Sequence, residues 1–112
     1  MAEQPTPGAV PGGAVPGAVP GPEQVLAGLR DALAAILDPD DLERIDVGAI
    51  DADTALLSLP VDSLALMALM NRIEDTFRVY IPEERAYRFA TVGEVVEYVR
   101  AQAAAKAARR PG

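Results

Sequence analysis

Apolar residues recur every three or four positions in three separate stretches of this 112-residue chain. This spacing puts them on one side of an α-helix, whereas a half-buried strand would alternate apolar and polar residues. We therefore predict three main helices, over residues 22 to about 37, 63 to about 77, and from 91 onward. Their apolar positions are Val25, Leu26, Leu29, Leu33, Ile36 and Leu37, then Leu66, Leu69, Met70, Ile73 and Phe77, then Val92, Val95, Val96 and Val99.

The ends of these helices carry their own signals. Pro22 suits the first position of a helix, where the N–H that it lacks would have no partner. Asp38-Pro39 stops the first helix, because a proline disfavours helical conformation in the residue before it. Thr91 and Glu94 stand three residues apart, which matches a capping box at the start of the last helix.

A long connection, residues 38–61, separates the first two main helices. Its apolar residues are regularly placed, so we expect the connection to pack against the helices, with a helical turn over 40–44. A short helix over 83–88, opened by Pro82, precedes the last one, and Phe89 is expected in the core. The predicted fold class is all-α: a small bundle of three main helices and one short helix, with a long loop between the first two. The loop residues expected to pack down are Leu42, Ile45, Val47, Ile50, Leu56, Leu57 and Leu59.

The two ends of the chain differ in composition from this body. Residues 1–21 repeat the unit Gly-Ala-Val-Pro, whose prolines and glycines oppose ordered structure, so we predict a disordered arm that serves as a tether or as a tail without function. The bundle is expected to occupy residues 22–104. Alanines prolong the last helix by propensity alone, and we predict that residues 105–112 form a frayed basic tail.

Composition excludes several classes of function. The chain has no histidine and no cysteine, which removes disulfides, thiolate chemistry and the usual zinc sites. The acidic run at 38–43 lacks the order of an EF-hand loop, so we expect no metal. Formal net charge is −7, which disfavours nucleic acid or an anionic membrane as a partner and favours basic protein surfaces. No apolar run reaches the roughly 18 to 20 residues that span a bilayer. We expect a cytoplasmic monomer.

Ser63 is the candidate for chemistry. Asp62 is suited to capping the second main helix, so Ser63 falls in its first turn, where unpaired N–H groups and the helix dipole favour an anion. Ser63 could also be part of simple capping chemistry. An unactivated hydroxyl needs a general base, usually histidine, to act as a nucleophile, and none is present. If Ser63 carries chemistry, another group must be attached to it.

From Glu23 to Arg100 the chain resembles the acyl carrier proteins, the phosphopantetheine-binding carriers of fatty-acid, polyketide and nonribosomal peptide synthesis. Asp62-Ser63-Leu64 looks like the attachment motif of that family. The supporting residues stand at the family's spacing: Leu57 and Leu59 before the motif, Phe77 fourteen residues after Ser63, then Ile81-Pro82-Glu83-Glu84 and Thr91-Val92-Gly93.

The resemblance implies that a phosphopantetheinyl transferase esterifies Ser63 with 4′-phosphopantetheine, whose thiol carries acyl groups as thioesters. Asp62 would cap the helix, orient Ser63 and help the transferase to recognise it. No residue of the chain would be catalytic. Partner enzymes such as an acyltransferase or ketosynthase would meet the hydrophobic side chains of Leu64 and Met67, and their basic surfaces would meet Glu74, Asp75, Glu83 and Glu84.

The chain departs from the family pattern at a few positions. The family commonly has Leu-Gly shortly before the Asp-Ser pair, where this chain has Leu59-Pro60. Ala65 and Ala68 stand where fatty-acid carriers often have acids, and Asn71 where they often have an apolar contact. These departures favour a polyketide or related specialised pathway. The alternatives are a peptidyl or aryl carrier, a fatty-acid carrier and, more distantly, a helical interaction module without a prosthetic group.

Overall fold

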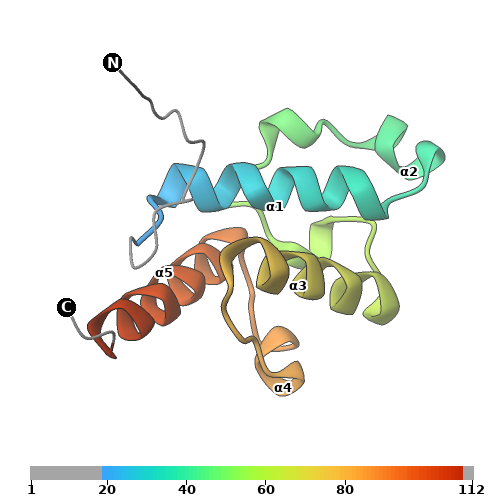
Figure 1. The fold of residues 1–112 in the computed structure, drawn as a ribbon. Coiled ribbons are helices and arrows are strands. Elements are labelled where there is room, and N and C mark those ends of the chain that lie inside the picture. Colours follow the sequence, from blue (N-terminus) through green and yellow to red (C-terminus); the bar gives the residue numbers. More distant parts are fainter. Residues whose placement is uncertain (1–18, 110–112) are drawn as a thin grey trace, which may run out of the picture.

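The computed structural model describes residues 19–109, and it has the predicted all-α fold (Figure 1). Helix α1 (Pro22–Ile36) packs against both α3 (Ser63–Phe77) and α5 (Val92–Arg109). The connections contain α2 (Pro39–Arg44), the 3-10 turns η1 (Val47–Ala49) and η2 (Leu56–Ser58), and the short helix α4 (Glu83–Ala86). Within residues 19–109, β pairing is limited to one isolated bridge between Ala55 and Thr91.

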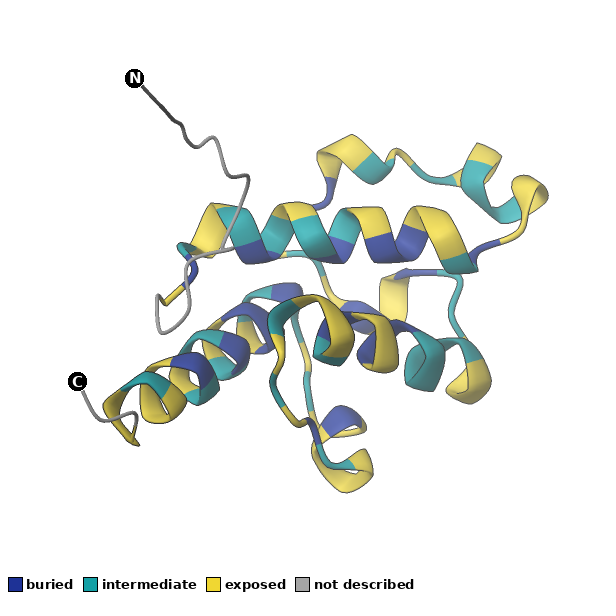
Figure 2. Ribbon diagram, in the orientation of Figure 1, coloured by how far each residue is buried: buried dark blue, intermediate teal, exposed yellow. Residues whose placement is uncertain are grey.

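The core lies between α1, α3 and α5 and includes part of the long connection (Figure 2). Among the described residues, every buried side chain is apolar, so the core is held by hydrophobic burial and close packing. The largest fully buried side chains are Val25, Leu29, Leu33, Leu69, Met70, Ile73, Val92, Val95 and Val99. Each of them belongs to one of the three apolar stripes predicted from the sequence.

Helices α1 and α3 approach closely where a glycine faces an aromatic ring. A Cβ atom placed on Gly28 would lie 2.6 Å from Cζ of Phe77, so the ring occupies the space that any larger residue at 28 would need. Helix α3 ends at Phe77, the residue that makes this contact. Arg78 takes a left-handed conformation with φ of 58° and ends the helix in the way that a glycine more often does.

Backbone groups of the long connection hold it on the bundle, in addition to its buried apolar side chains. The side chain of Arg30 donates two hydrogen bonds to the carbonyl oxygen of Ile50, from Nε at 2.9 Å and from Nη2 at 2.5 Å. Further along, the N–H groups of Val92 and Gly93 donate to the carbonyls of Thr54 and Ala52, at 2.9 and 2.8 Å. The connection therefore packs down as predicted, held by α1 on one side and by the start of α5 on the other.

One residue of the connection differs from the prediction. Leu57, expected to pack inward, is 98% exposed, whereas Leu56 and Leu59 are buried. In η2 the N–H of Leu59 donates to the carbonyl of Leu56, and a turn of three residues brings positions 56 and 59 to the same side. Leu57 consequently points to solvent. Phe89 was also expected in the core, but it is only half-buried and packs against the edge of the core.

The predicted domain boundaries also shift at both ends. Pro20, assigned to the arm, is buried, and its carbonyl accepts a hydrogen bond of 3.1 Å from Nε of Arg100. Helix α5 continues past residue 104 to Arg109, and Nζ of Lys106 donates to the carbonyl of Arg78 at 3.0 Å. Tertiary contacts thus add to the helix propensity of the alanines. Residues 1–18 of the predicted arm and 110–112 of the predicted tail lie outside the described residues.

Candidate functional site

Asp62 caps the start of α3. Its backbone is extended, with φ of −90° and ψ of −173°, so Asp62 is the N-cap and Ser63 is the first helical residue. Oδ1 of Asp62 accepts a hydrogen bond of 2.8 Å from the N–H of Ala65, and its carbonyl accepts from Leu66. The aspartate thereby satisfies one N–H of the first turn through its side chain, which confirms the predicted cap.

Ser63 lies on the surface with unpaired backbone donors beside it. The side chain is exposed, and within residues 19–109 the N–H groups of Ser63 and Leu64 have no hydrogen-bond acceptor. A 15-residue helix also concentrates positive potential at this end. The site can therefore accommodate an anion bonded to the Ser63 oxygen, since donors, dipole and access all point to the same place.

The other serine of the chain is in a different situation. Ser58 is exposed too, but its Oγ donates a hydrogen bond of 2.6 Å to the carbonyl of Ala55 within η2. It ends a three-residue turn, whereas Ser63 begins a helix. Of the two serines, only Ser63 has the surroundings that favour a phosphate ester.

Comparison with known proteins agrees with this geometry. Residues 27–99, most of the chain, match the family model described as the phosphopantetheine attachment site. This chain belongs to the acyl carrier protein family. An acyl carrier protein of Streptomyces coelicolor is 38% identical over 85 residues, 75% of this chain and 87% of the relative. Another, from an Exiguobacterium species, is 36% identical over 78 residues, 69% of this chain and 91% of the relative.

A third acyl carrier protein, from Beutenbergia cavernae, is 31% identical over 78 residues, covering 69% of this chain and 88% of the relative. No solved structure matches. The prosthetic group of the family is 4′-phosphopantetheine. An exposed hydroxyl at an anion-favouring helix start fits that group, which when bound would supply the thiol that this carrier lacks. Acyl carriers are generally not catalysts, and partner enzymes modify and load them.

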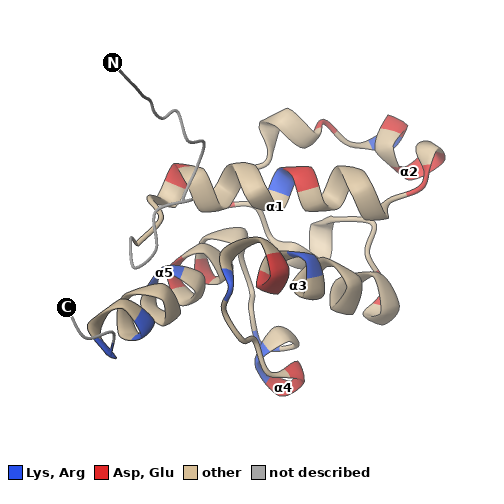
Figure 3. Cartoon of the chain, viewed as in Figure 1, with Lys and Arg blue, Asp and Glu red and all other residues tan. Residues whose placement is uncertain are grey.

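The residues expected to meet those partner enzymes fall into two sets. Leu64 is 82% exposed beside Ser63, and Asp75, Glu83 and Glu84 are exposed too. Figure 3 shows acidic positions on both α3 and α4. Met67 is different, because it is half-buried and packs against the core. Met67 thus has a structural role besides the partner contact that the resemblance implies.

Glu74 also has an internal role. Its Oε2 accepts a hydrogen bond of 2.6 Å from the N–H of Ile81, a buried residue in the segment that leads to α4. Glu74 is itself half-buried. The carboxylate therefore holds the α3–α4 connection against α3, a role that the spacing of charges along the helix could not indicate.

Within residues 19–109, no group of three or more acidic side chains is arranged to hold a metal ion. Within the same residues, no helix has the length and apolar character needed to cross a membrane.

Proposed function

We propose that this acyl carrier protein is modified on Ser63 and serves a specialised pathway, of which polyketide synthesis is the first candidate. The observation that supports Ser63 is the exposed hydroxyl at the start of α3, next to two N–H groups without an acceptor in residues 19–109. Such donors stabilise a phosphodiester better than they stabilise a neutral hydroxyl. The product of modification is thereby favoured at this position.

The roles of the surrounding residues follow from their contacts. Asp62 holds the first turn through the N–H of Ala65 and so keeps Ser63 at the end of a regular helix. Leu64 offers a transferase or ketosynthase an apolar contact directly beside the modified oxygen. Asp75, Glu83 and Glu84 offer exposed negative charge to basic docking surfaces, which guides orientation and association more than it adds affinity.

The proposal of a specialised pathway rests on the surface of α3. Ala65 and Ala68 are half-buried and Asn71 is exposed, so this helix offers less negative charge near Ser63 than fatty-acid carriers often do. A partner adapted to it needs shape and apolar complementarity as well as positive charge. A peptidyl or aryl carrier is the second candidate, and a fatty-acid carrier the third.

The attachment site is tested by intact mass spectrometry. The purified chain is incubated with a broad-specificity phosphopantetheinyl transferase and coenzyme A. We expect the native chain and Ser58→Ala to gain the mass of one phosphopantetheinyl group, and Ser63→Ala to gain none. Ser58→Ala is a matched control, because it removes the other exposed serine hydroxyl of the chain. A native chain that gains no mass would identify a helical module without a prosthetic group.

The pathway is tested on the modified chain. Malonyl transfer from malonyl-coenzyme A by a polyketide malonyltransferase, followed by condensation with a polyketide ketosynthase, is expected to outpace loading by amino-acid or aryl adenylating enzymes. Elongation by a fatty-acid synthase is the third arm of the comparison. Faster loading in either of the other arms would replace the polyketide proposal with the corresponding carrier class.

A further inference from the structure

A groove of about 500 Å³ opens beside the start of α3, on the side of α1 and α2. Asp62 and Ala65, the residues on either side of the Ser63-Leu64 pair, both line it. The volume is in the range of small-molecule sites. A group attached to Ser63 therefore begins at the rim of a preformed groove.

The groove has an apolar base and a polar far wall. Leu37 and Leu59 are buried beneath it, and Pro60 and Val61 form its near side. Pro60 is one of the departures from the family pattern, and its ring supplies apolar surface that a glycine would not. The near side is thus suited to methyl and methylene groups.

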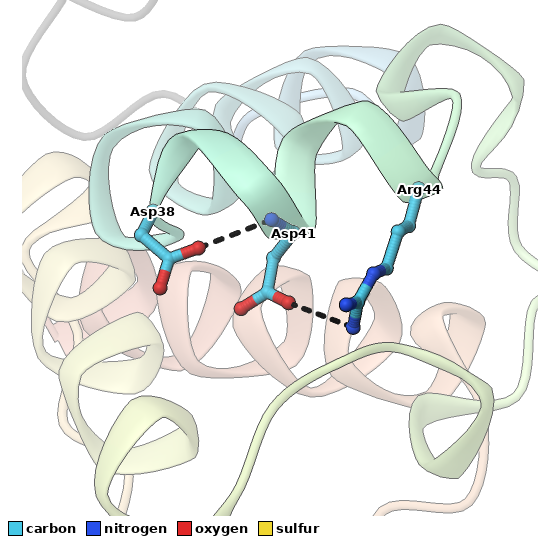
Figure 4. A network of polar contacts seen from close by, with 3 residues as sticks. All are labelled: Asp38, Asp41 and Arg44. Atoms are coloured by element: carbon cyan, nitrogen blue, oxygen red, sulfur yellow. Dashed lines mark hydrogen bonds and ion pairs between the residues drawn. The ribbon is translucent and has the colours of Figure 1, made fainter.

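The far wall carries two carboxylates, those of Asp38 and Asp41. Oδ1 of Asp38 accepts the N–H of Asp41 at 3.0 Å, and Oδ1 of Asp41 lies 3.7 Å from a guanidinium nitrogen of Arg44. Figure 4 shows both carboxylates projecting from the same side of α2. Within the described residues, the second oxygen of each carboxylate has no hydrogen-bond donor.

Pantetheine matches these two walls in order along its length. Next to the phosphate it has two geminal methyl groups, then a hydroxyl and two amide N–H groups. The methyl groups suit Pro60 and Val61, and the hydroxyl and amide donors suit carboxylate oxygens. The carboxylates would repel a second anion, so the phosphodiester stays at the helix start and the neutral part of the arm enters the groove.

We propose that this groove is the resting place of the pantetheine arm in the modified protein, with Asp41 as its positioning residue. This inference rests on the proposed modification of Ser63. It adds that α2 and the end of α1 bind the arm when the carrier is not bound to a partner enzyme. A held arm is shielded from solvent and leaves the carrier with its thiol in a defined direction.

The test is nuclear magnetic resonance on the isotope-labelled, modified protein. We expect nuclear Overhauser contacts from the geminal methyl protons of the arm to the methyl groups of Leu59 and Val61. We also expect amide shift changes over residues 36–41 when modified and unmodified protein are compared. These residues lie across the groove from Ser63, so the covalent bond alone does not account for shifts there.

Three variants separate a positioning role from a structural one. Asp41→Ala is expected to lose the contacts of the arm with Leu59 and Val61, and Asp41→Asn, which keeps an oxygen acceptor, is expected to retain them. Asp40→Ala is the matched control, because Asp40 is an exposed acid in the same turn of α2 and does not line the groove. It is expected to leave the contacts unchanged.

The outcomes distinguish this inference from the one on which it rests. If Ser63 gains the prosthetic group but shift changes stay within residues 61–66 and the arm shows no contact with Leu59 or Val61, the arm extends into solvent and the groove proposal is wrong. If contacts form but Asp41→Ala retains them, Asp41 is not the positioning residue. If Ser63 gains no mass at all, the proposed function itself fails, which the mass measurement reports separately.

Discussion

The starts of α3 and α5 have similar side-chain caps, but they differ in what their remaining N–H groups contact. At α5, Oγ1 of Thr91 accepts the N–H of Glu94 at 3.3 Å, as the predicted capping box requires. Oε1 of Glu94 accepts the N–H of Ala90 at 2.8 Å rather than that of Thr91, so the reciprocal bond of the box is shifted by one residue. At α3, Asp62 caps the helix alone. Both helix starts are therefore capped by an oxygen-bearing side chain.

The difference lies in the remaining N–H groups. At α5 the N–H groups of Val92 and Gly93 donate to carbonyls of the long connection, so this helix start is an anchor for the fold. At α3 the equivalent groups, those of Ser63 and Leu64, have no acceptor within residues 19–109. A helix start can receive a ligand only where the rest of the chain leaves it uncovered, and the cap alone does not decide that.

The largest effect is expected where the connection meets the start of α5. A Cβ atom on Gly93 would lie 2.9 Å from the backbone carbonyl oxygen of Ala52. Because that oxygen belongs to the backbone and cannot rotate away, Gly93→Ala should lower the free energy of unfolding by about 1 to 3 kcal/mol. Chemical denaturation measures it.

Gly48→Ala is the control for that measurement, because a Cβ atom there would meet only Oδ1 of Asp46 at 3.4 Å. It should change the stability by about 0.5 kcal/mol or less. Equal stability of Gly93→Ala and the native chain would mean that the connection does not depend on its close contact with α5.

Removing each cap in turn sharpens the comparison. Asp62→Ala and Thr91→Ala should each cost about 1 kcal/mol, since each leaves an N–H of a first helical turn without its side-chain acceptor. Only Asp62→Ala should also slow the modification of Ser63, because only that cap orders the turn that holds the hydroxyl. Denaturation and the initial rate of mass gain measure the two effects. Equal slowing in both variants would show that modification follows stability alone.

The smallest effect is expected from surface charge. Asp75→Lys should slow acyl transfer from a partner enzyme severalfold at low salt and less at high salt, because steering by exposed charges is screened by ions. Glu97→Lys, an exposed acid of α5, should leave transfer unchanged. Transfer kinetics over a range of salt concentrations test this. Similar slowing in both variants would mean that docking depends on the net charge of the carrier rather than on the charge of α3.

Glu74 is unsuited to that experiment, although the sequence pairs it with Asp75. Reversing its charge would remove the acceptor of the Ile81 N–H and so disturb the connection to α4. A buried or half-buried donor left without an acceptor costs stability in its own right. A loss of transfer in a Glu74 variant would therefore mix docking with folding.

Some of this protein could be predicted because the relevant contacts are local. The Asp62 cap and the capping bonds at α5 join residues three or four positions apart, and they mark where these helices begin. Helical periodicity indicated the core positions. The same local signals identified Ser63 as the first residue of its helix. The extent of α5 could not be predicted in this way, because Lys106 contacts Arg78, which lies 28 positions earlier.

The sequence by itself determined which segments are helical, where they begin and which serine starts α3, since these depend on neighbours along one turn. Only the tertiary structure decided that Arg30 holds the carbonyl of Ile50, that Lys106 reaches Arg78, and that the start of α5 is covered while the start of α3 is open. It also brought α2 to the edge of Ser63's helix to form the groove. These features depend on contacts between residues far apart in the chain, whose pairing arises only when the helices pack together.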